Sequence, residues 1–282
     1  MTTSVNLIGT GRVGRTLLRL LAGQEGILLG QIASRRVEDA QRTVAEIGAG
    51  MACDISEMEA ADIWILTVPD TSIAEVARDI ARRGTAPAVA VHCSGYHGAD
   101  VMATLRAKGW SLASAHPMLS FADPEVSAAR FPGTWVGVEG DAAAVQVVAG
   151  LFEGLGARTF PIQSDAKALY HAAAVVTNNF TTVLQGIALE AWEAAGVPDD
   201  VARSLNASLL KSTLENIEAL GPAGALTGPA ARGDADVVNA QGQRVAEWHP
   251  EAGELYRLLS RLAVRLKTSG TTRSDRPEDS PP

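Results

Sequence analysis

Short apolar runs alternate with amphipathic stretches over residues 1–163. The apolar runs predict buried strands, over residues 5–9, 27–33, 62–68, 88–92, 111–115, 134–138 and 159–162. Between them, the stretches at about 37–47, 71–83 and 142–155 have the spacing of helices. Buried strands that alternate with helices are typical of a sheet covered on both faces. The pattern therefore predicts an α/β domain with a mostly parallel sheet.

The pattern changes at Ser164, after which no convincing strand follows. Helical segments are predicted over residues 164–195, about 198–219, about 235–247 and about 250–267. The breaks between them contain glycine and proline. We therefore predict an α/β domain over 1–163 and an all-α domain over 164–268. The polar, proline-rich residues 269–282 are predicted to be a disordered tail.

A glycine-rich loop directly follows the first predicted strand and opens a helix. Its sequence is Gly9-Thr10-Gly11-Arg12-Val13-Gly14. In this setting the first glycine permits a tight turn, the second admits a pyrophosphate, and the third lets the helix pack on the strand. The N-terminus of the helix then offers N–H groups to the phosphates. These six residues predict a Rossmann domain that binds a dinucleotide, and the alternative is a turn without a ligand.

The end of the second strand indicates which dinucleotide is bound. An NAD site usually places Asp or Glu there, whereas this chain has Ser34-Arg35-Arg36. A hydroxyl and two guanidiniums suit a phosphate, which arginine binds with two parallel hydrogen bonds. We therefore predict NADP(H). The alternative is that both arginines are only solvated surface.

Ligands of open α/β sheets lie beyond the carboxyl ends of the strands. That rule selects Val68, Pro69, Ser94 and His116 as candidates near a nicotinamide. Ser94 could bind the carboxamide or a substrate oxygen, or could simply shape the turn that ends its strand. His116 could act in catalysis or bind substrate, or be structural.

The helix over 164–195 carries polar residues on one face. At about 100° per residue, Lys167, His171 and Asn178 lie within about 40° of each other. Hydride delivery to a carbonyl or imine builds negative charge, which a lysine in a desolvated cleft can neutralise or protonate. We therefore predict Lys167 as the general acid, with His171 and Asn178 orienting the substrate. The alternative is a lysine on a solvated first turn.

Two further residues are candidates for binding substrate. Asn179 follows Asn178, and Arg232 lies in the break at 226–234. Arg232 could bind a substrate carboxylate with two hydrogen bonds. Equally, Arg232 and Asp234 could belong to a turn and a helix cap.

Composition and charge narrow the class of protein. The chain has 46% hydrophobic and 20% charged residues and a net charge of −8, which gives no electrostatic reason to predict nucleic-acid binding. Its two cysteines form no disulfide framework, and no histidine–carboxylate cluster has metal-ligand spacing, so we predict no metal. With no signal peptide and no uninterrupted apolar run of about 18 residues, we predict a cytoplasmic protein without a membrane span.

Several motifs together resemble a known family. They are the glycine loop, Ser34-Arg35, LTVPD at 66–70, HCSG at 92–95, AHPMLSF at 115–121, KALYHAA and TNN at 167–179, and LTGPAARGD at 226–234. In combination they resemble the Rossmann-like/DUF2520 family, over nearly the whole chain except the tail. That family is similar to the 6-phosphogluconate dehydrogenase-like superfamily, which includes ketopantoate reductase, pyrroline-5-carboxylate reductase and β-hydroxyacid dehydrogenases. The resemblance implies an N-terminal Rossmann domain and a helical C-terminal domain that often forms a dimer.

The resemblance also bears on the chemistry. Ketopantoate reductase and the β-hydroxyacid dehydrogenases carry a catalytic lysine with an asparagine four residues on. Lys167 matches the lysine, His171 stands where the asparagine would be, and Asn178 is the candidate substitute. Ser94 and His116 resemble the serine and histidine-proline of prephenate dehydrogenases.

We therefore expect an NADP(H)-dependent oxidoreductase that reduces a small, ketopantoate-like 2-oxo acid, and we expect a homodimer. An imine reductase of the pyrroline-5-carboxylate type, a prephenate-type dehydrogenase and an NADP(H)-sensing binding protein are the alternatives.

Overall fold

The computed structural model describes residues 2–274. The chain divides into two compact units, Met1–Asn179 and Phe180–Pro282. This division falls inside the helical run that follows residue 163, C-terminal to the boundary that the change of pattern predicts. The predicted tail from residue 269 begins with the last residue of a helix, and residues 275–282 of that tail lie outside the described part of the chain.

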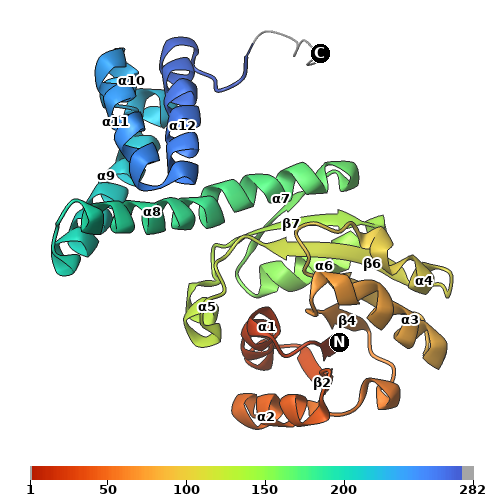
Figure 1. Cartoon of the computed structure of the whole chain (residues 1–282). Helices are drawn as coiled ribbons and strands as arrows, with labels where there is room; N and C mark the ends of the chain where they lie inside the picture. The colour runs from red at the N-terminus through yellow and green to blue at the C-terminus, as the bar shows by residue number, and fades with distance from the viewer. Residues whose placement is uncertain (1, 275–282) are drawn as a thin grey trace. The chain divides into compact units, whose positions relative to one another are not determined.

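An eight-stranded sheet forms the centre of the first unit, with strand order β3-β2-β1-β4-β5-β6-β7-β8 (Figure 1). The strands are β1 Thr3–Ile8, β2 Ile27–Ala33, β3 Met51–Ala52, β4 Ile63–Leu66, β5 Val89–His92, β6 Ser111–Pro117, β7 Trp135–Gly140 and β8 Arg158–Pro161. All pairs are parallel except β6 with β7. The predicted Rossmann-type α/β fold is therefore confirmed. Strand β3 is absent from the prediction because two residues make no apolar run.

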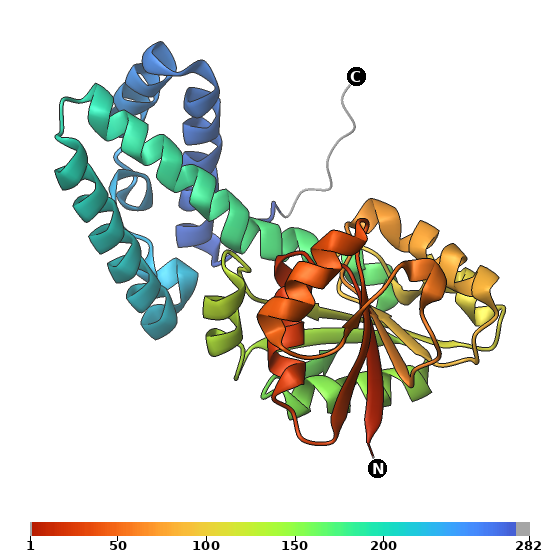
Figure 2. The ribbon, with the colours of Figure 1, turned by 90° about the horizontal axis from the view of Figure 1, so that it is seen from below.

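Helices cover both faces of the sheet, as Figures 1 and 2 show. One core lies between the sheet and α1 (Arg12–Ala22), α2 (Val37–Ile47) and α6 (Ala142–Gly154). The other lies between the sheet and α3 (Ile73–Arg83), the 3-10 helix η3 (Ala99–Met102) and α4 (Ala103–Arg106). Neighbouring strand residues alternate between the two cores: Ile63 and Ile65 belong to the first, Trp64 and Leu66 to the second. Apolar side chains on both faces explain why the strands have continuous apolar sequences.

The helical run after the sheet has an irregular section. It begins with the 3-10 helix η4 (Ser164–Ala166) and α7 (Lys167–Val175), passes through the π-helix η5 (Val176–Phe180), and continues as α8 (Thr181–Ala194). The predicted long helix is therefore confirmed, but not as a regular α-helix. A π-helix turns more slowly per residue, so angles counted at 100° per residue do not hold beyond Val176.

The same run contains a candidate membrane span that the count of apolar runs does not anticipate. Ser164–Ala194 has the length and composition of a membrane-spanning helix, with a mean hydropathy of 1.2 over its most apolar 18-residue window, and none of that window is buried. Counting uninterrupted apolar residues misses this helix because isolated polar residues such as Asn178 break the count. Length and composition also fit an apolar helix that another protein surface covers.

The second unit is helical throughout its described part. Besides α8 it contains α9 (Asp199–Ala225), α10 (Pro229–Arg232), α11 (Ala235–Trp248) and α12 (Pro250–Ser269). Gly221 interrupts α9 with a φ of 69°, directly before Pro222. Asn206 ties α8 to α9, since its side chain accepts a hydrogen bond from the indole of Trp192 at 3.0 Å and donates one to the carbonyl of Gln185 at 3.2 Å.

Candidate active site

The glycine loop has the geometry that dinucleotide binding requires. Gly9 has a φ of 110°, and a β-carbon there would lie 2.7 Å from the backbone of Thr67. A β-carbon on Gly14 would lie 1.9 Å from the carbonyl oxygen of Gly9. Gly11, in contrast, has no atom within 4 Å of such a position, and no side chain caps the helix that it opens. The loop therefore combines tight packing at both ends with open space at the middle glycine, where a phosphate can approach the helix N-terminus.

A cavity of about 420 Å³ lies beside this loop, next to the end of β2. Its lining residues are Thr10, Gly11, Arg15, Ser34, Asp39, Arg42, Thr43 and Glu46. The hydroxyl of Thr10 donates to that of Ser34 at 3.0 Å, which joins the loop to the strand end. Arg35 and Arg36 are exposed and do not line this cavity.

Asp39 is hydrogen-bonded to two arginines near this cavity. Its carboxylate accepts two hydrogen bonds from Arg36, at 2.9 and 3.0 Å, and one from Arg42. These hydrogen bonds hold the pKa of Asp39 below its usual value. Arg15 and Arg19 pair with Glu46 in the same way. Arg15 and Arg42 are absent from the sequence prediction because each lies within a helix, where only the fold brings it to the cavity.

A second open cavity, of about 580 Å³, lies at the carboxyl end of β6. His116, at the end of that strand, lies opposite Tyr170 and His171 of α7, and the cavity continues past Asn178 and Asn179. The structure thus brings together four of the predicted residues, His116, His171, Asn178 and Asn179. Tyr170 is absent from the prediction, although its place one turn after Lys167 and beside His171 marks the same helix face.

The side chains of His116 and Tyr170 form a hydrogen-bonded pair. Nδ1 of His116 lies 3.0 Å from the phenol oxygen of Tyr170. Burial lowers the pKa of His116 to about 4, and the charges of His171 and Lys167 act in the same direction while Asp70 opposes them. Burial also raises the pKa of Tyr170 to about 12. At neutral pH both groups are therefore neutral, and the phenol donates to Nδ1 in the tautomer that carries the imidazole proton on Nε2.

Gly95 allows the histidines to approach each other at the end of β5. A β-carbon on Gly95 would lie 2.3 Å from Nδ1 of His171 and 2.8 Å from Nε2 of His116. The two imidazole rings have centroids 5.4 Å apart and meet edge to face. Nδ1 of His171 is buried and has no hydrogen-bond partner among the described residues. A side chain on residue 95 would separate these groups.

Lys167 is absent from the residues that line this cavity. The residue is 1% exposed, and its Nζ donates to the carbonyl of Ser94 at 2.9 Å and to the hydroxyl of Ser114. Lys167 is the first residue of α7, one turn before His171, and its side chain is buried against the Ser94–Gly95 turn that His171 also approaches. The role of Lys167 as general acid therefore stays a prediction.

Ser94 uses its hydroxyl within its own turn. The oxygen accepts hydrogen bonds from the backbone of Tyr96 at 3.1 Å and of His97 at 3.0 Å, and the residue is buried. This geometry fits the interpretation of Ser94 as a residue that shapes the strand end. Val68 is half-buried and Pro69 exposed at the end of β4, beside the glycine loop that Thr67 contacts.

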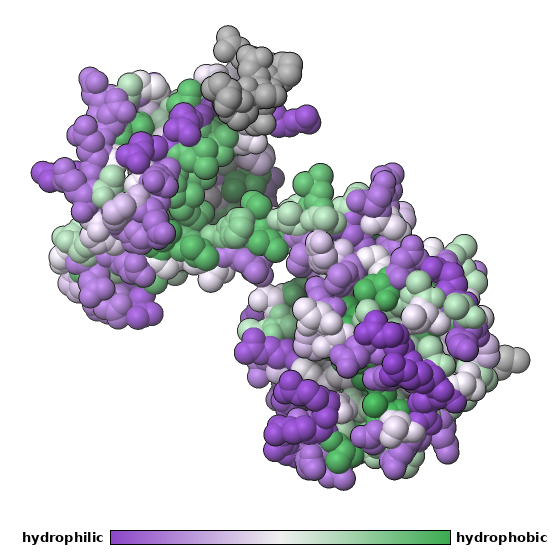
Figure 3. Space-filling view, turned by 45° about the vertical axis from the view of Figure 1, so that its right-hand side comes forward, coloured by the Kyte–Doolittle hydropathy of each residue, from purple (hydrophilic) through white to green (hydrophobic). Residues whose placement is uncertain are grey.

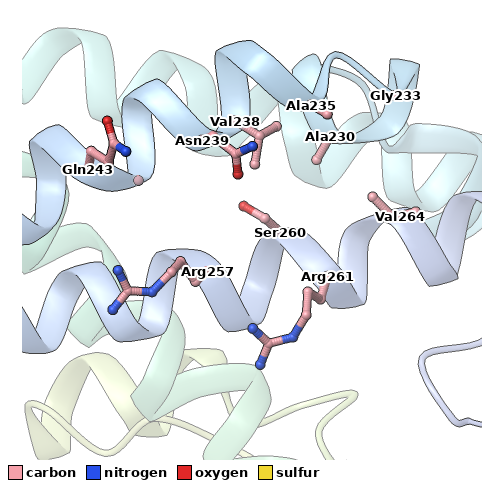
Figure 4. A pocket seen from close by; sticks show the side chains of 11 residues that line it. Ala230, Gly233, Ala235, Val238, Asn239, Gln243, Arg257, Ser260, Arg261 and Val264 are labelled. Carbon is pink, nitrogen blue, oxygen red and sulfur yellow. The ribbon is translucent and has the colours of Figure 1, made fainter.

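Arg232 lies in the other unit, at the end of α10. Its guanidinium donates to the carboxylate of Asp234 at 3.0 Å, which fits the interpretation as a turn. A cavity of about 750 Å³ begins beside it, between α11 and α12, where Val238 and Asn239 point toward Ser260 (Figure 4). Within the described part of the chain, no acid–base pair like that of His116 and Tyr170 lines this cavity. We therefore take the cavity at β6 as the candidate active site.

No metal centre is apparent in residues 2–274. No three or more of their histidine, cysteine, aspartate and glutamate side chains are grouped so that they could hold a metal ion.

Comparisons with known proteins cover both units. Residues 1–117 match the family of Rossmann-like domains, and residues 134–263 match DUF2520, a domain of unknown function. No curated protein sequence matches the chain.

Solved structures resemble the chain over almost its whole length. It is similar to protein TM1727 from Thermotoga maritima, with 28% identity, a TM-score of 0.75, and coverage of 94% of this chain and 99% of that one. It is also similar to protein BF3122 from Bacteroides fragilis, named provisionally as an NADP oxidoreductase, with 26% identity, a TM-score of 0.74 and coverage of 94% and 98%. An imine reductase from Myxococcus stipitatus, solved with NADP+, shares the fold at 14% identity, with a TM-score of 0.66 and coverage of 95% and 96%.

Proposed function

Since this chain is a Rossmann-like/DUF2520 protein, we propose that it is an NADP(H)-dependent oxidoreductase that reduces a small 2-oxo acid. The observation that carries the proposal is the hydrogen-bonded pair of His116 and Tyr170, which lines a cavity at the carboxyl end of the sheet. Ligands of this fold class bind at that edge. The name of the similar Bacteroides fragilis protein supports the same class of reaction.

The chain has a place for the cofactor. The open space over Gly11 and the uncapped N-terminus of α1 fit a pyrophosphate. Ser34, Arg15 and Arg42 line the cavity that we assign to the 2′-phosphate, and its two carboxylates, Asp39 and Glu46, are each paired with arginines. This arrangement supports NADP(H) over NAD(H). A bound nicotinamide would supply the hydride.

His116 is the proposed proton donor, in place of Lys167. As hydride reaches a carbonyl carbon, the oxygen gains negative charge and takes the proton from Nε2 of His116. Tyr170 donates its phenol proton to Nδ1 as the Nε2 proton leaves, and the pair is restored when solvent protonates Nε2 and the phenolate takes its proton back from Nδ1. Asn178 and Asn179 supply amide donors that can hold a carboxylate. Reduction of a carbonyl produces an alkoxide, which needs the proton that His116 and Tyr170 supply. This pair therefore favours a carbonyl substrate.

A cyclic imine is the second candidate substrate. The residues that line the cavity include no Lys, Arg, Asp or Glu, so no fixed charge would repel an iminium ion. Reduction of an iminium carbon gives a neutral amine without a further proton, so His116 would then bind the substrate without donating. The fold shared with an imine reductase is compatible with this reaction.

The test is NADPH oxidation, followed at 340 nm, against ketopantoate, other 2-oxo acids and pyrroline-5-carboxylate. A 2-oxo acid should be reduced, and His116→Gln should lower kcat at least about 100-fold because general acid catalysis contributes about that much. Cofactor binding without turnover of any substrate would instead identify an NADP(H)-sensing protein. Turnover of imines alone, with kcat insensitive to His116→Gln, would favour the second candidate.

We further propose a soluble, cytoplasmic homodimer. Large apolar residues of α9 are exposed, including Leu209 at 57%, Leu214 at 56% and Leu220 at 63%, and α8 buries none of its residues. Figure 3 shows hydrophobic side chains gathered on the visible face of the helical unit. A second copy of the chain could cover these apolar side chains. The cytoplasmic location is supported by both cysteines, which are free thiols, as is usual in a reducing compartment. Analytical ultracentrifugation of the wild type and of Leu214→Glu tests the dimer: a monomeric wild type would contradict it.

A further inference from the structure

One buried ammonium group connects the elements that form the candidate active site. Nζ of Lys167, on α7, donates to the carbonyl of Ser94 after β5 and to the hydroxyl of Ser114 on β6. Oε1 of Glu139, on β7, lies 3.7 Å from the same nitrogen. His116 follows two residues after Ser114, and His171 lies one turn after Lys167. The ammonium therefore links β6, which carries His116, to α7, which carries His171.

Glu139 is the counter-ion of the buried ammonium of Lys167. It is 5% exposed and lies opposite Ser114 in the antiparallel pair of β6 and β7. Oε1 accepts a hydrogen bond from the backbone N–H of Ala99 at 2.8 Å, and Oε2 accepts one from the hydroxyl of Ser164. A charge buried without a partner is strongly destabilising, whereas this carboxylate has both its counter-ion and its hydrogen bonds.

The two groups have opposing effects on the protonation of Lys167. Burial lowers the pKa of Lys167, and Glu139 raises it again, with smaller effects of Cys93 and Asp70 in the same direction. The ammonium in turn acts on His116, which also faces Tyr170 and His171 of α7 and Asp70 of η2 (Asp70–Ser72). Among these groups, Lys167 is the one whose charge depends on Glu139.

We propose that Glu139 is a positioning residue, which keeps Lys167 charged beneath the Ser94–Gly95 turn, so that the ammonium adds to burial in keeping the imidazole of His116 neutral. This inference rests on the proposed role of His116 as proton donor. Lys167 then acts through its charge and its hydrogen bonds to Ser94 and Ser114, without touching substrate. A lone acidic residue in the apolar sequence of β7, at Glu139, is the signal of this role in the sequence.

The experiment is a titration of the histidine Cε1–H signals by NMR, on the full chain without substrate. Glu139→Gln preserves the shape of the carboxylate but removes its charge, so Lys167 should lose its proton more readily. The titration midpoint of His116 should then move toward neutrality, by about one pH unit for the loss of one nearby charge. Glu153→Gln is the control, because that carboxylate also accepts a hydrogen bond from a hydroxyl, of Thr159, but lies outside the cluster around Lys167.

A second variant keeps the test valid if Glu139→Gln does not fold. The double variant Lys167→Met with Glu139→Gln removes both charges, so no buried charge is left unpaired, and it should move the His116 midpoint in the same direction. Midpoints that match the wild type in the folded variants would overturn the inference, since a purely structural role would lower only the melting temperature. A shifted midpoint in a protein that reduces no substrate would support the inference and reject the proposed function of the site.

Discussion

Gly95 and His171 approach so closely that a β-carbon on residue 95 would lie 2.3 Å from Nδ1 of the histidine. The same β-carbon would lie 2.8 Å from Cε1 and Nε2 of His116. Gly95→Ala must therefore push both rings out of place. We expect a loss of about 1–3 kcal/mol in the free energy of unfolding, as for other overpacked sites, and a larger relative loss of kcat.

The matched control is Gly98→Ala, in the same loop. A β-carbon there would have its nearest neighbours, the carboxylate oxygens of Glu139, at 3.9 Å, which is ordinary contact. Chemical denaturation and NADPH oxidation should show this variant close to the wild type. If the two alanine variants behaved alike, the close approach of the histidines over Gly95 would not matter to activity.

Replacement of the phenol tests the pair that the proposed reaction uses. Tyr170→Phe leaves the ring but removes the hydroxyl that is hydrogen-bonded to Nδ1 of His116. The imidazole can then carry its proton on either nitrogen, so part of the enzyme has no donor at Nε2. We expect kcat with a 2-oxo acid to fall about 10- to 100-fold, within the range of general acid catalysis, with little change in NADPH affinity. An unchanged kcat would remove Tyr170 from the mechanism.

Gly11→Ala should separate folding from cofactor binding. A methyl group there meets no atom of the protein within 4 Å, and the backbone φ of −71° suits alanine, so stability should change by less than about 1 kcal/mol. The same methyl would occupy the space of the pyrophosphate. Fluorescence titration should show at least a tenfold loss of NADPH affinity. Gly150→Ala, also in open space but on α6, should bind NADPH normally.

The arginines around Asp39 predict a preference between cofactors. Arg42→Ala removes one of two guanidiniums that neutralise this carboxylate beside the proposed 2′-phosphate site. We expect NADPH to bind about 5- to 10-fold more weakly, as for one lost charge-assisted hydrogen bond, while NADH binding stays the same. Arg82→Ala is the control. It removes an ion pair of the same kind, with Asp79 on α3, that does not line the cavity beside the glycine loop. Equal losses for both cofactors would contradict a 2′-phosphate site.

The sequence predicts the sheet well because each strand lies between two cores. Ile63 to Leu66 is apolar at every position, and only a strand covered on both faces needs that pattern. The glycine loop is equally predictable, since Gly14 is required by the carbonyl of Gly9 within the same strand–turn–helix unit, although Gly9 itself is required by Thr67 after β4. The local sequence is sufficient to predict an element when the shape of that element determines which residues it needs.

The burial of Lys167 could not be predicted in this way. Lys167 and His171 share a regular turn of α7, as periodicity predicts, and the π-helix at Val176–Phe180 changes only the angle to Asn178. Periodicity does not give the burial of Lys167. Its partners Ser94, Ser114 and Glu139 come from three other elements. The burial of Lys167 depends on tertiary contacts with these elements. The periodic pattern of its own helix gives no information about such contacts.

His92 should make the protein less stable in acid. It is fully buried, its Nε2 lies 3.1 Å from the carbonyl oxygen of Gly98, and burial lowers its pKa from 6.5 to about 3. Below pH 6.5 the unfolded chain takes up a proton that the folded protein does not, so each pH unit down to about 3 costs about 1.4 kcal/mol. His92→Gln removes this proton uptake. Unfolding by urea at pH 7 and pH 5 should therefore show a smaller loss of stability for the variant than for the wild type. His97→Gln, in the same turn but only half-buried, should keep the wild-type difference, and an equal loss in all three proteins would show that His92 is not protonated on unfolding.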